Sequence, residues 1–310
     1  MPKIIVATRK SKLALWQANF VIELLKKEKP DHEFELLELT TDGDKIQNAP
    51  LSKFGGKGLF VKEIEKALLE GKADIAVHSA KDMPARITKN LKIGAILKRH
   101  NPFDALISRD KKKLVELPKN AVIGTSSPRR KSQLLMLRPD FNIKQLRGNV
   151  NTRLEKLESG EYDAIILAAA SIERMGWQDK LSQIIDDRHM VPSGGQGAIA
   201  VETRAGDSKT NELVKLINDQ KTFLEVEAER SFLARIDAGC HMPVGVYCHT
   251  FSDERFHMRA IICDNEGKES VIRERIGFKN VITGFELAND ILDAGGSAIL
   301  AKLRENSLQN

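Results

Sequence analysis

Short apolar segments alternate with amphipathic helical segments along the first third of the chain. Residues 3–8, 34–40 and 74–78 have the pattern of strands, and residues 11–29 and 59–69 have that of helices. The third strand is short and largely apolar, as buried strands of parallel sheets are. This order of elements predicts an open α/β sheet with right-handed crossovers.

The same order recurs in the middle of the chain. Strand patterns cover residues 122–124, 142–146 and 163–168, and helix patterns cover residues 128–137 and 150–157. A chain of 310 residues is long enough for two or three domains. We therefore expect two α/β domains in the first two thirds of the sequence.

The last third has a different pattern. A helix at 223–236 is followed by strands at 244–250, 256–263 and 270–276 and by a helix around 285–303. Strands that follow one another without intervening helices predict an antiparallel sheet. The predicted fold class is thus two α/β domains plus a smaller C-terminal α+β domain.

The composition is 41% hydrophobic and 30% charged, which is ordinary for a globular protein. Only 5% of the residues are aromatic, which argues against a long base-stacking surface. The longest apolar run, Ala164–Ala170, is far shorter than the roughly 20 residues of a membrane helix. Because the N-terminal pattern lacks a signal peptide and the three cysteines are sparse, we expect a cytoplasmic protein.

Positive charge is concentrated in one stretch. Residues 121–153 hold seven Lys or Arg and one Asp, an excess that equals the net charge of +6 of the whole chain. Five of the seven are arginines, which suit bidentate binding of carboxylate or phosphate. Three interpretations are open at this point: a solvated basic face, a nucleic-acid surface, or a pocket for a small molecule with several negative charges.

Three turns between a strand and a helix carry arginine beside a capping side chain. They are residues 8–11 (Thr-Arg-Lys-Ser), 124–130 (Gly-Thr-Ser-Ser-Pro-Arg-Arg) and 147–153 (Arg-Gly-Asn-Val-Asn-Thr-Arg). Their serines and Asn149 can cap the helices that follow, and helix N-termini bind anions. Capping alone does not explain the doubled arginine. Because ligands bind at the carboxyl ends of strands in α/β sheets, these turns favour a pocket for several carboxylates over a DNA surface.

Residues 78–84 (His-Ser-Ala-Lys-Asp-Met-Pro) follow another predicted strand. Asp82 would share a pocket with the arginines and stay ionised there. It could then stabilise a developing cation or accept N–H bonds. A local ion pair with Lys81 that has no chemical role is the alternative. Lys81 could also form a Schiff base, but nothing in the pattern requires one.

Residues 237–243 (Asp-Ala-Gly-Cys-His-Met-Pro) place Cys240 in a loop between a helix and a strand. An accessible thiol there could act as a nucleophile, whereas a buried one would be inert. Cys248 and Cys263 lie within strand patterns and are expected in the core. The cysteines and histidines lack zinc-ligand spacing, so we expect no metal site. Residues 55–58 lack the spacing of a phosphate-binding loop.

Together these segments resemble the porphobilinogen deaminases, also called hydroxymethylbilane synthases, which act in haem and tetrapyrrole biosynthesis. The motifs that carry the resemblance span nearly the whole chain. They are residues 7–14, 56–60, 78–84, 124–130, 147–153, 195–198 and 239–245.

The resemblance implies three domains, of which the first two are like the lobes of a periplasmic binding protein or a transferrin. Domain 1 would be discontinuous, with residues 1–99 and 196–218; domain 2 would cover 100–195 and domain 3 would cover 219–310. The resemblance also implies a dipyrromethane cofactor held by a thioether to Cys240. Four porphobilinogen units would be added to it head to tail with loss of ammonia, and linear hydroxymethylbilane would then be released by hydrolysis.

The resemblance assigns roles to site residues as well. Asp82 would be catalytic, because it would stabilise the methylene-pyrrole cation left when ammonia departs. Besides Cys240, the cofactor would be bound by Ser79, Lys81, Asp82, Thr125, Ser127, Arg129 and Arg130. Substrate carboxylates would be bound by Arg9, Ser11, Gln17, Arg147, Arg153 and Arg174. The long polar segment at 41–58, with Lys57, would act as a lid.

Two other classes of protein compete with this interpretation. A two-lobed protein that binds anionic solutes would need neither Cys240 nor the Lys81–Asp82 pair, and it would usually be exported. A nucleic-acid-binding protein would bind with strong salt dependence and carry no covalent cofactor. We therefore expect porphobilinogen as the small-molecule partner, no nucleic-acid or membrane partner, and a monomer.

Overall fold

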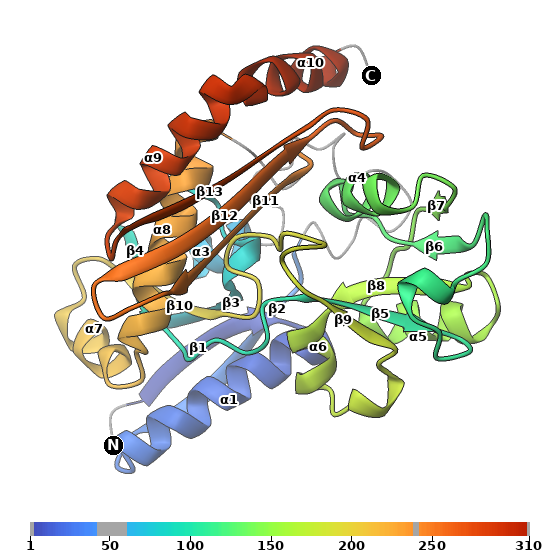
Figure 1. The fold of residues 1–310 in the computed structure, drawn as a ribbon. Coiled ribbons are helices and arrows are strands. Elements are labelled where there is room, and N and C mark those ends of the chain that lie inside the picture. The colour runs from blue at the N-terminus through green and yellow to red at the C-terminus, as the bar shows by residue number, and fades with distance from the viewer. Residues whose placement is uncertain (1–2, 42–60, 238–241, 309–310) are drawn as a thin grey trace. The chain divides into compact units, whose positions relative to one another are not determined.

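The computed structural model describes residues 3–41, 61–237 and 242–308. The chain forms two compact units (Figure 1). The first combines Met1–His100 with Gly197–Val226, and the second combines Asn101–Gln196 with Glu227–Asn310. The division into three domains at the expected boundaries stays a prediction.

The first unit contains a five-stranded sheet in the order β2-β1-β3-β10-β4. Its strands are β1 (Lys3–Arg9), β2 (Glu33–Leu39), β3 (Ile75–Ser79), β4 (Leu91–Ile96) and β10 (Ile199–Arg204). β1 is parallel to both β2 and β3. The expected βαβαβ order is confirmed, with helices α1 (Lys12–Glu28) and α3 (Lys62–Leu69) between the strands.

β10 was not expected from the strand pattern. It is antiparallel to β3 and β4 and separates them in the sheet, although all strands of the second unit's mixed sheet come between β4 and β10 in the sequence. The helix α7 (Ser208–Lys215) follows it. The start of β10 therefore lies at the sheet edge where β3 ends, beside the turn that follows β3.

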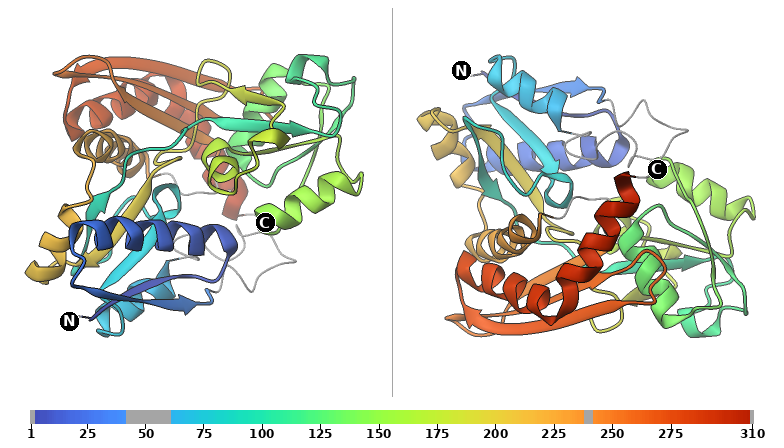
Figure 2. Two further views of the ribbon diagram at one scale, coloured as in Figure 1. Left: turned by 90° about the horizontal axis from the view of Figure 1, so that it is seen from below. Right: turned by 90° about the horizontal axis from the view of Figure 1, so that it is seen from above.

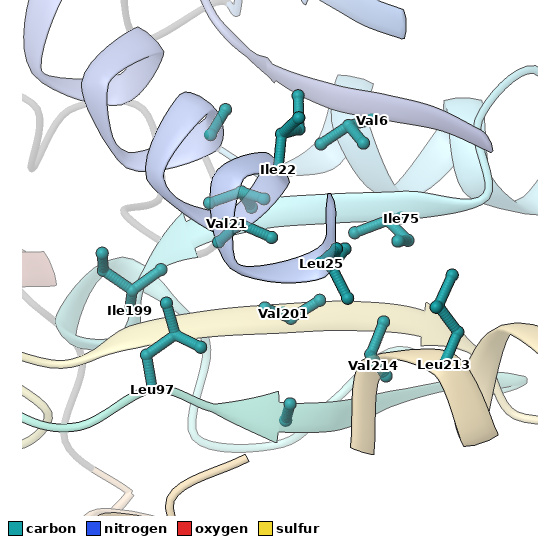
Figure 3. Close-up of a cluster of buried hydrophobic side chains, with 13 residues drawn as sticks. Val6, Val21, Ile22, Leu25, Ile75, Leu97, Ile199, Val201, Leu213 and Val214 are labelled. Atoms are coloured by element: carbon teal, nitrogen blue, oxygen red, sulfur yellow. The ribbon is translucent and has the colours of Figure 1, made fainter. Parts of the chain in front are cut away.

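One face of the first sheet is covered by α1 (Figure 3). Val21, Ile22 and Leu25 of this helix pack against a core that includes Val6 and Val201. The apolar side chains that recur at helical spacing in the sequence, Leu13, Trp16, Phe20 and Leu24, are only half-buried and lie beside these buried residues. Trp16 and Phe20 instead stack on each other and meet the ring of His100 edge-on.

The second unit contains a sheet with the same pattern of directions, in the order β7-β6-β8-β5-β9. Its strands are β5 (Asp104–Ser108), β6 (Val122–Gly124), β7 (Asn142–Lys144), β8 (Ala164–Ala168) and β9 (Gln183–Ile185). β6 is parallel to β7 and β8, and β5 is antiparallel to β8 and β9. Helices α4 (Pro128–Leu137), α5 (Val150–Glu158) and α6 (Ala169–Arg174) follow the three parallel strands.

The same unit ends in an antiparallel sheet, which confirms the expected fold class. Its strands are β11 (Val244–Thr250), β12 (Arg255–Cys263) and β13 (Ser270–Phe278), and α8 (Gln220–Ile236) precedes them. The single helix expected near the C-terminus is two helices, α9 (Val281–Ile291) and α10 (Ser297–Leu308), along the sheet (Figure 2). Gly295 has φ 108° at their junction, a left-handed conformation that interrupts a helix.

Candidate active site

The turns after β1 and β3 lie at one edge of the first sheet, because the two strands are parallel neighbours (Figure 1). Arg9 ends β1, and Ser11 caps α1 by accepting a hydrogen bond from the N–H of Ala14 at 3.3 Å. Lys81 and Asp82 belong to a single 3₁₀ turn, Ala80–Asp82, directly after β3. The sheet thus brings together four of the residues expected to act on the ligand.

Backbone hydrogen bonds hold the turn after β3. The N–H of Ala80 donates to the carbonyl of Ala198 at 3.0 Å, just before β10 begins. The N–H of Met83 donates to the carbonyl of Ala80 at 3.3 Å. Ser79, Lys81 and Asp82 are half-buried, so their side chains remain accessible to a ligand. Gln17 is buried on the second turn of α1.

The second sheet has its own set of turns at the carboxyl ends of β6, β7 and β8. Ser127 Oγ accepts from the N–H of Arg130 at 3.4 Å and caps α4, while Asn149 Oδ1 accepts from the N–H of Thr152 at 3.0 Å and caps α5. The expected capping by serine and Asn149 is confirmed. Ser126 Oγ donates to the carbonyl of Leu146 at 2.6 Å and so links the two turns.

Arg129 and Arg130 are both buried and both bind Asp104, the first residue of β5. Arg129 Nη1 donates to Asp104 Oδ2 at 2.7 Å and to the carbonyl of Val191 at 2.9 Å. Arg130 Nε donates to Asp104 Oδ1 at 2.9 Å. Two guanidiniums share one carboxylate, which leaves an excess positive charge in this cluster. Their expected role as cofactor ligands stays a prediction.

Asp104 has no exposed surface. Burial alone would raise its pKa, but the charges of Arg129 and Arg130 and their hydrogen bonds outweigh that effect and hold the pKa well below its usual range. The Gln196 amide also donates to Asp104 Oδ1, at 3.1 Å, and to the carbonyl of Pro102, at 2.8 Å. The sequence interpretation missed Asp104, although an acidic residue that opens an otherwise apolar strand was a usable signal.

The other three arginines differ in their surroundings. Arg147 is half-buried, and its Nε has no hydrogen-bond partner among the described residues. Arg153 Nε donates to the carbonyl of Gly148 at 2.9 Å. Arg174 is buried at the end of α6, and burial lowers its pKa to about 10. Guanidinium groups form charge-assisted hydrogen bonds with carboxylates, so this donor set fits a ligand with several carboxylates.

Cys240 and Lys57 lie outside the described residues. The elements beside the cysteine are described: α8 ends at Ile236 and β11 begins at Val244. Glu229 of α8 accepts from the N–H of Gly195 at 2.6 Å and from that of Cys248 at 2.8 Å, and so joins α8 to β11. Cys248 and Cys263 are buried, as expected, and burial raises the pKa of Cys263 to about 12.

The fold and the site define a protein with two α/β sheets that present basic residues at the carboxyl ends of parallel strands, where such sheets bind ligands. Comparison with family models identifies the family. Residues 4–212 match "porphobilinogen deaminase, dipyromethane cofactor binding domain", and residues 223–293 match the porphobilinogen deaminase C-terminal domain. The chain belongs to the porphobilinogen deaminase family, whose members are enzymes with a dipyrromethane cofactor.

Curated relatives agree over nearly the full length. A porphobilinogen deaminase of Brevibacillus brevis is 46% identical over 99% of this chain and 99% of its own length. One of Legionella pneumophila is 51% identical over 88% of each chain. Among solved structures, the periplasmic VFT2 domain of Bordetella pertussis BvgS is 14% identical over 70% of this chain and 86% of its own, with a TM-score of 0.40.

Proposed function

We propose that the chain condenses four porphobilinogen molecules head to tail onto a dipyrromethane cofactor attached to Cys240 and releases linear hydroxymethylbilane by hydrolysis. Each condensation forms one carbon–carbon bond and releases one ammonia. The observation that carries the proposal is the position of Asp82, which lies at the same sheet edge as Arg9 and Ser11. The substrate bears two carboxylates, which need anion-binding groups. It also reacts through a cation, which a carboxylate such as Asp82 can stabilise.

Asp82 is the proposed catalytic residue. When ammonia leaves porphobilinogen, the remaining methylene-pyrrole carries a positive charge shared with the ring N–H. A carboxylate that accepts this N–H bond stabilises the cation while it forms and while it is attacked. The half-buried position of Asp82 supports this role, because partial exclusion of water strengthens the interaction.

The basic side chains are the proposed carboxylate ligands. Each pyrrole carries an acetate and a propionate, so the negative charge increases with every addition. Arg9, Ser11, Gln17, Arg147, Arg153 and Arg174 would bind substrate carboxylates, and Ser79, Lys81, Thr125, Ser127, Arg129 and Arg130 would bind those of the cofactor. The excess positive charge beside Asp104 supports the second assignment. The bound dipyrromethane supplies the pyrrole carbon to which the first substrate attaches.

The setting of the reaction completes the proposal. We propose that the segment 41–58, which contains Lys57, acts as a lid over the bound ligand. We also propose a cytoplasmic monomer that has no nucleic-acid or membrane partner. No helix among the described residues is long and apolar enough to cross a membrane.

Intact mass of the denatured protein tests the attachment. The wild-type chain should carry extra mass equal to two linked pyrrole units, and Cys240→Ala should carry none. Cys248→Ala is the matched control, since Cys248 is a buried thiol of the same chain, and it should keep the extra mass.

A bare wild-type mass leads to a second measurement after porphobilinogen is added. A gain of pyrrole units that requires Cys240 supports the proposal, because the chain was then an apo-enzyme. No gain at all would favour a protein that binds anionic solutes without covalent chemistry. Extra mass that persists in Cys240→Ala would contradict the attachment site.

A further inference from the structure

His78 and Glu202 form a buried pair beneath the turn that carries Asp82. His78 Nε2 lies 3.1 Å from Glu202 Oε2. Their exposed fractions are 6% and 0%. His78 pairs across the sheet with Ala200, and Glu202 pairs with Ala76, so the two side chains are diagonal neighbours on one face. The contact therefore joins β3 to β10 by side chains in addition to the backbone ladder.

A third buried group faces this pair from α3. Glu65 is buried, and Thr88 Oγ1 donates to its Oε2 at 2.8 Å. Burial raises the pKa of Glu65, and the nearby charge of Glu202 raises it further, against opposing contributions from Thr88, His78 and Lys62. One carboxylate oxygen each of Glu65 and Glu202 has no partner among the described residues.

Burying such a cluster costs free energy of folding, although it does hold the two strands together. Polar and ionisable side chains lose hydration when they are buried, and well-packed apolar residues of similar volume are often at least as stable. Unsatisfied buried oxygens add to the cost. Stability alone is thus a poor reason for this pair, and its position suggests another one.

His78 is the penultimate residue of β3, and the turn Ala80–Asp82 follows directly. The backbone bond from Ala80 to Ala198 holds the turn on the β10 side. The His78–Glu202 contact fixes the strand that leads into the turn, one pleat below it. Together the two contacts leave the turn little freedom to shift relative to β10.

We propose that His78 and Glu202 are positioning residues for Asp82, because their contact fixes the end of β3 from which the Ala80–Asp82 turn projects. This inference rests on the proposed catalytic role of Asp82. A displacement of about 1 Å at a reacting group costs on the order of a hundred-fold in rate. Loss of the contact should therefore lower kcat, while KM, which depends on the arginines and on Ser11, should change little.

The test compares two truncations of equal size in one buried cluster. Glu202→Ala removes the partner of His78, and Glu65→Ala removes a buried carboxylate that does not bond to His78. Both are measured as cofactor-loaded protein, checked by intact mass, for kcat and KM with porphobilinogen. We expect kcat to fall at least about ten-fold in Glu202→Ala, with KM within about two-fold of wild type, and kcat to be unchanged in Glu65→Ala.

Conservative variants keep the proposal testable if truncation prevents folding. Glu202→Gln keeps an acceptor for the His78 N–H, and His78→Gln keeps a donor near the position of Nε2. Each should retain most of the wild-type kcat. The double variant Glu202→Ala/His78→Gln should have the same kcat as Glu202→Ala alone, because both substitutions act through the one His78–Glu202 contact.

The outcomes separate this inference from the proposed function. Unchanged kcat in loaded Glu202→Ala, even with a lower melting temperature, overturns the positioning role and leaves only a structural one. An equal fall of kcat in Glu65→Ala overturns it as well. Wild-type turnover in Asp82→Asn would instead contradict the proposed catalytic role of Asp82, whatever Glu202 does.

Discussion

Arg129 binds Asp104 through both ends of its guanidinium, from Nη1 to Oδ2 at 2.7 Å and from Nη2 to Oδ1 at 3.2 Å. The side chain of Arg129 is therefore oriented before any ligand arrives. Arg130 binds the same carboxylate. Asp104 therefore orients both guanidinium groups and neutralises one of their two positive charges. A positively charged group fixed in this way has little conformational entropy to lose when it binds an anion.

Asp104→Asn should strongly destabilise the second unit. The change leaves two buried guanidiniums without a carboxylate, and removal of one partner from a buried pair costs about 3–5 kcal/mol. Urea unfolding at neutral pH measures the loss. Asp140→Asn is the control, because Asp140 pairs with Arg138 where both side chains are partly exposed, and it should shift the unfolding midpoint only slightly.

The difference in unfolding free energy between wild type and Asp104→Asn should depend on pH, because the pKa of Asp104 is low in the folded state. A depressed pKa in the folded state contributes stability above the ordinary value of 3.8, and this contribution is lost as pH falls through the folded pKa. The gap between wild type and Asp104→Asn should thus be constant from neutral pH down to about 4 and shrink only in stronger acid. A gap that closed between pH 7 and 5 would argue against this pair as its source.

The cluster around Asp104 also shows where prediction from the sequence fails. Local patterns predicted the strand-to-helix turns and their caps, because caps depend on residues three or four positions apart. The partner of Arg129 lies in a different strand, and charge counted within 121–153 does not include it. From the sequence, Arg129 and Arg130 therefore appeared free to bind a ligand, whereas in the structure Asp104 neutralises part of their charge.

Strand β10 illustrates the same limit for the fold. Its pattern, Ile199–Arg204, is apolar on both faces up to Glu202, yet its place in the first sheet depends on pairing with β3 and β4, which lie about 100 residues or more earlier in the sequence. The buried face of α1 also depends on the sheet. Val21, Ile22 and Leu25 are buried because the sheet lies on their side of the helix, whereas the larger side chains Trp16 and Phe20 next to them are only half-buried.

Asp82→Asn should remove nearly all turnover and leave the cofactor attached. The substitution keeps the shape of the side chain but removes the charge that stabilises the developing cation, so kcat should fall by about a hundred-fold or more. Steady-state kinetics on protein of verified mass measures the change. Asp110→Asn is a matched control, since Asp110 also lies beside a lysine, Lys112, but on an exposed loop, and its kcat should equal that of wild type.

Gly267→Ala should destabilise the contact between the β12–β13 turn and α4. Gly267 has φ 70°, and a Cβ there would lie 2.3 Å from the backbone oxygen of Ser132. Gly176 also has φ 70° but has nothing within 4 Å of the same position. Gly176→Ala should cost only the conformational strain, about 1–2 kcal/mol, and Gly267→Ala a further 1–3 kcal/mol or so from overpacking.

Both glycine variants belong to the second unit, so one urea titration compares them directly. Because α4 carries Arg129 and Arg130, the larger loss in Gly267→Ala should be accompanied by slower cofactor assembly on apo-protein. Equal losses in the two variants would mean that the turn moves away from α4 without cost.

Glu65→Gln should stabilise the protein at alkaline pH. Burial holds the pKa of Glu65 above its ordinary value of 4.5. The folded state therefore binds a proton that the unfolded chain releases, and its advantage is full below pH 4.5 and lost as pH rises through the folded pKa. The melting temperature of Glu65→Gln should exceed that of wild type by more at pH 8 than at pH 5. A larger excess at pH 5 would reverse the sign and contradict the burial of the charge.

Thiol counting gives an independent measure of cofactor attachment. Cys248 and Cys263 are buried, and the raised pKa of Cys263 keeps it protonated, so neither should react with iodoacetamide at pH 8 in the folded protein. After denaturation, cofactor-loaded protein should take up two equivalents, because a thioether on Cys240 blocks the third thiol. Apo-protein should take up three, and Cys240→Ala should take up two in either state. Three equivalents on protein that carries the extra mass would show that the cofactor is attached to a residue other than cysteine.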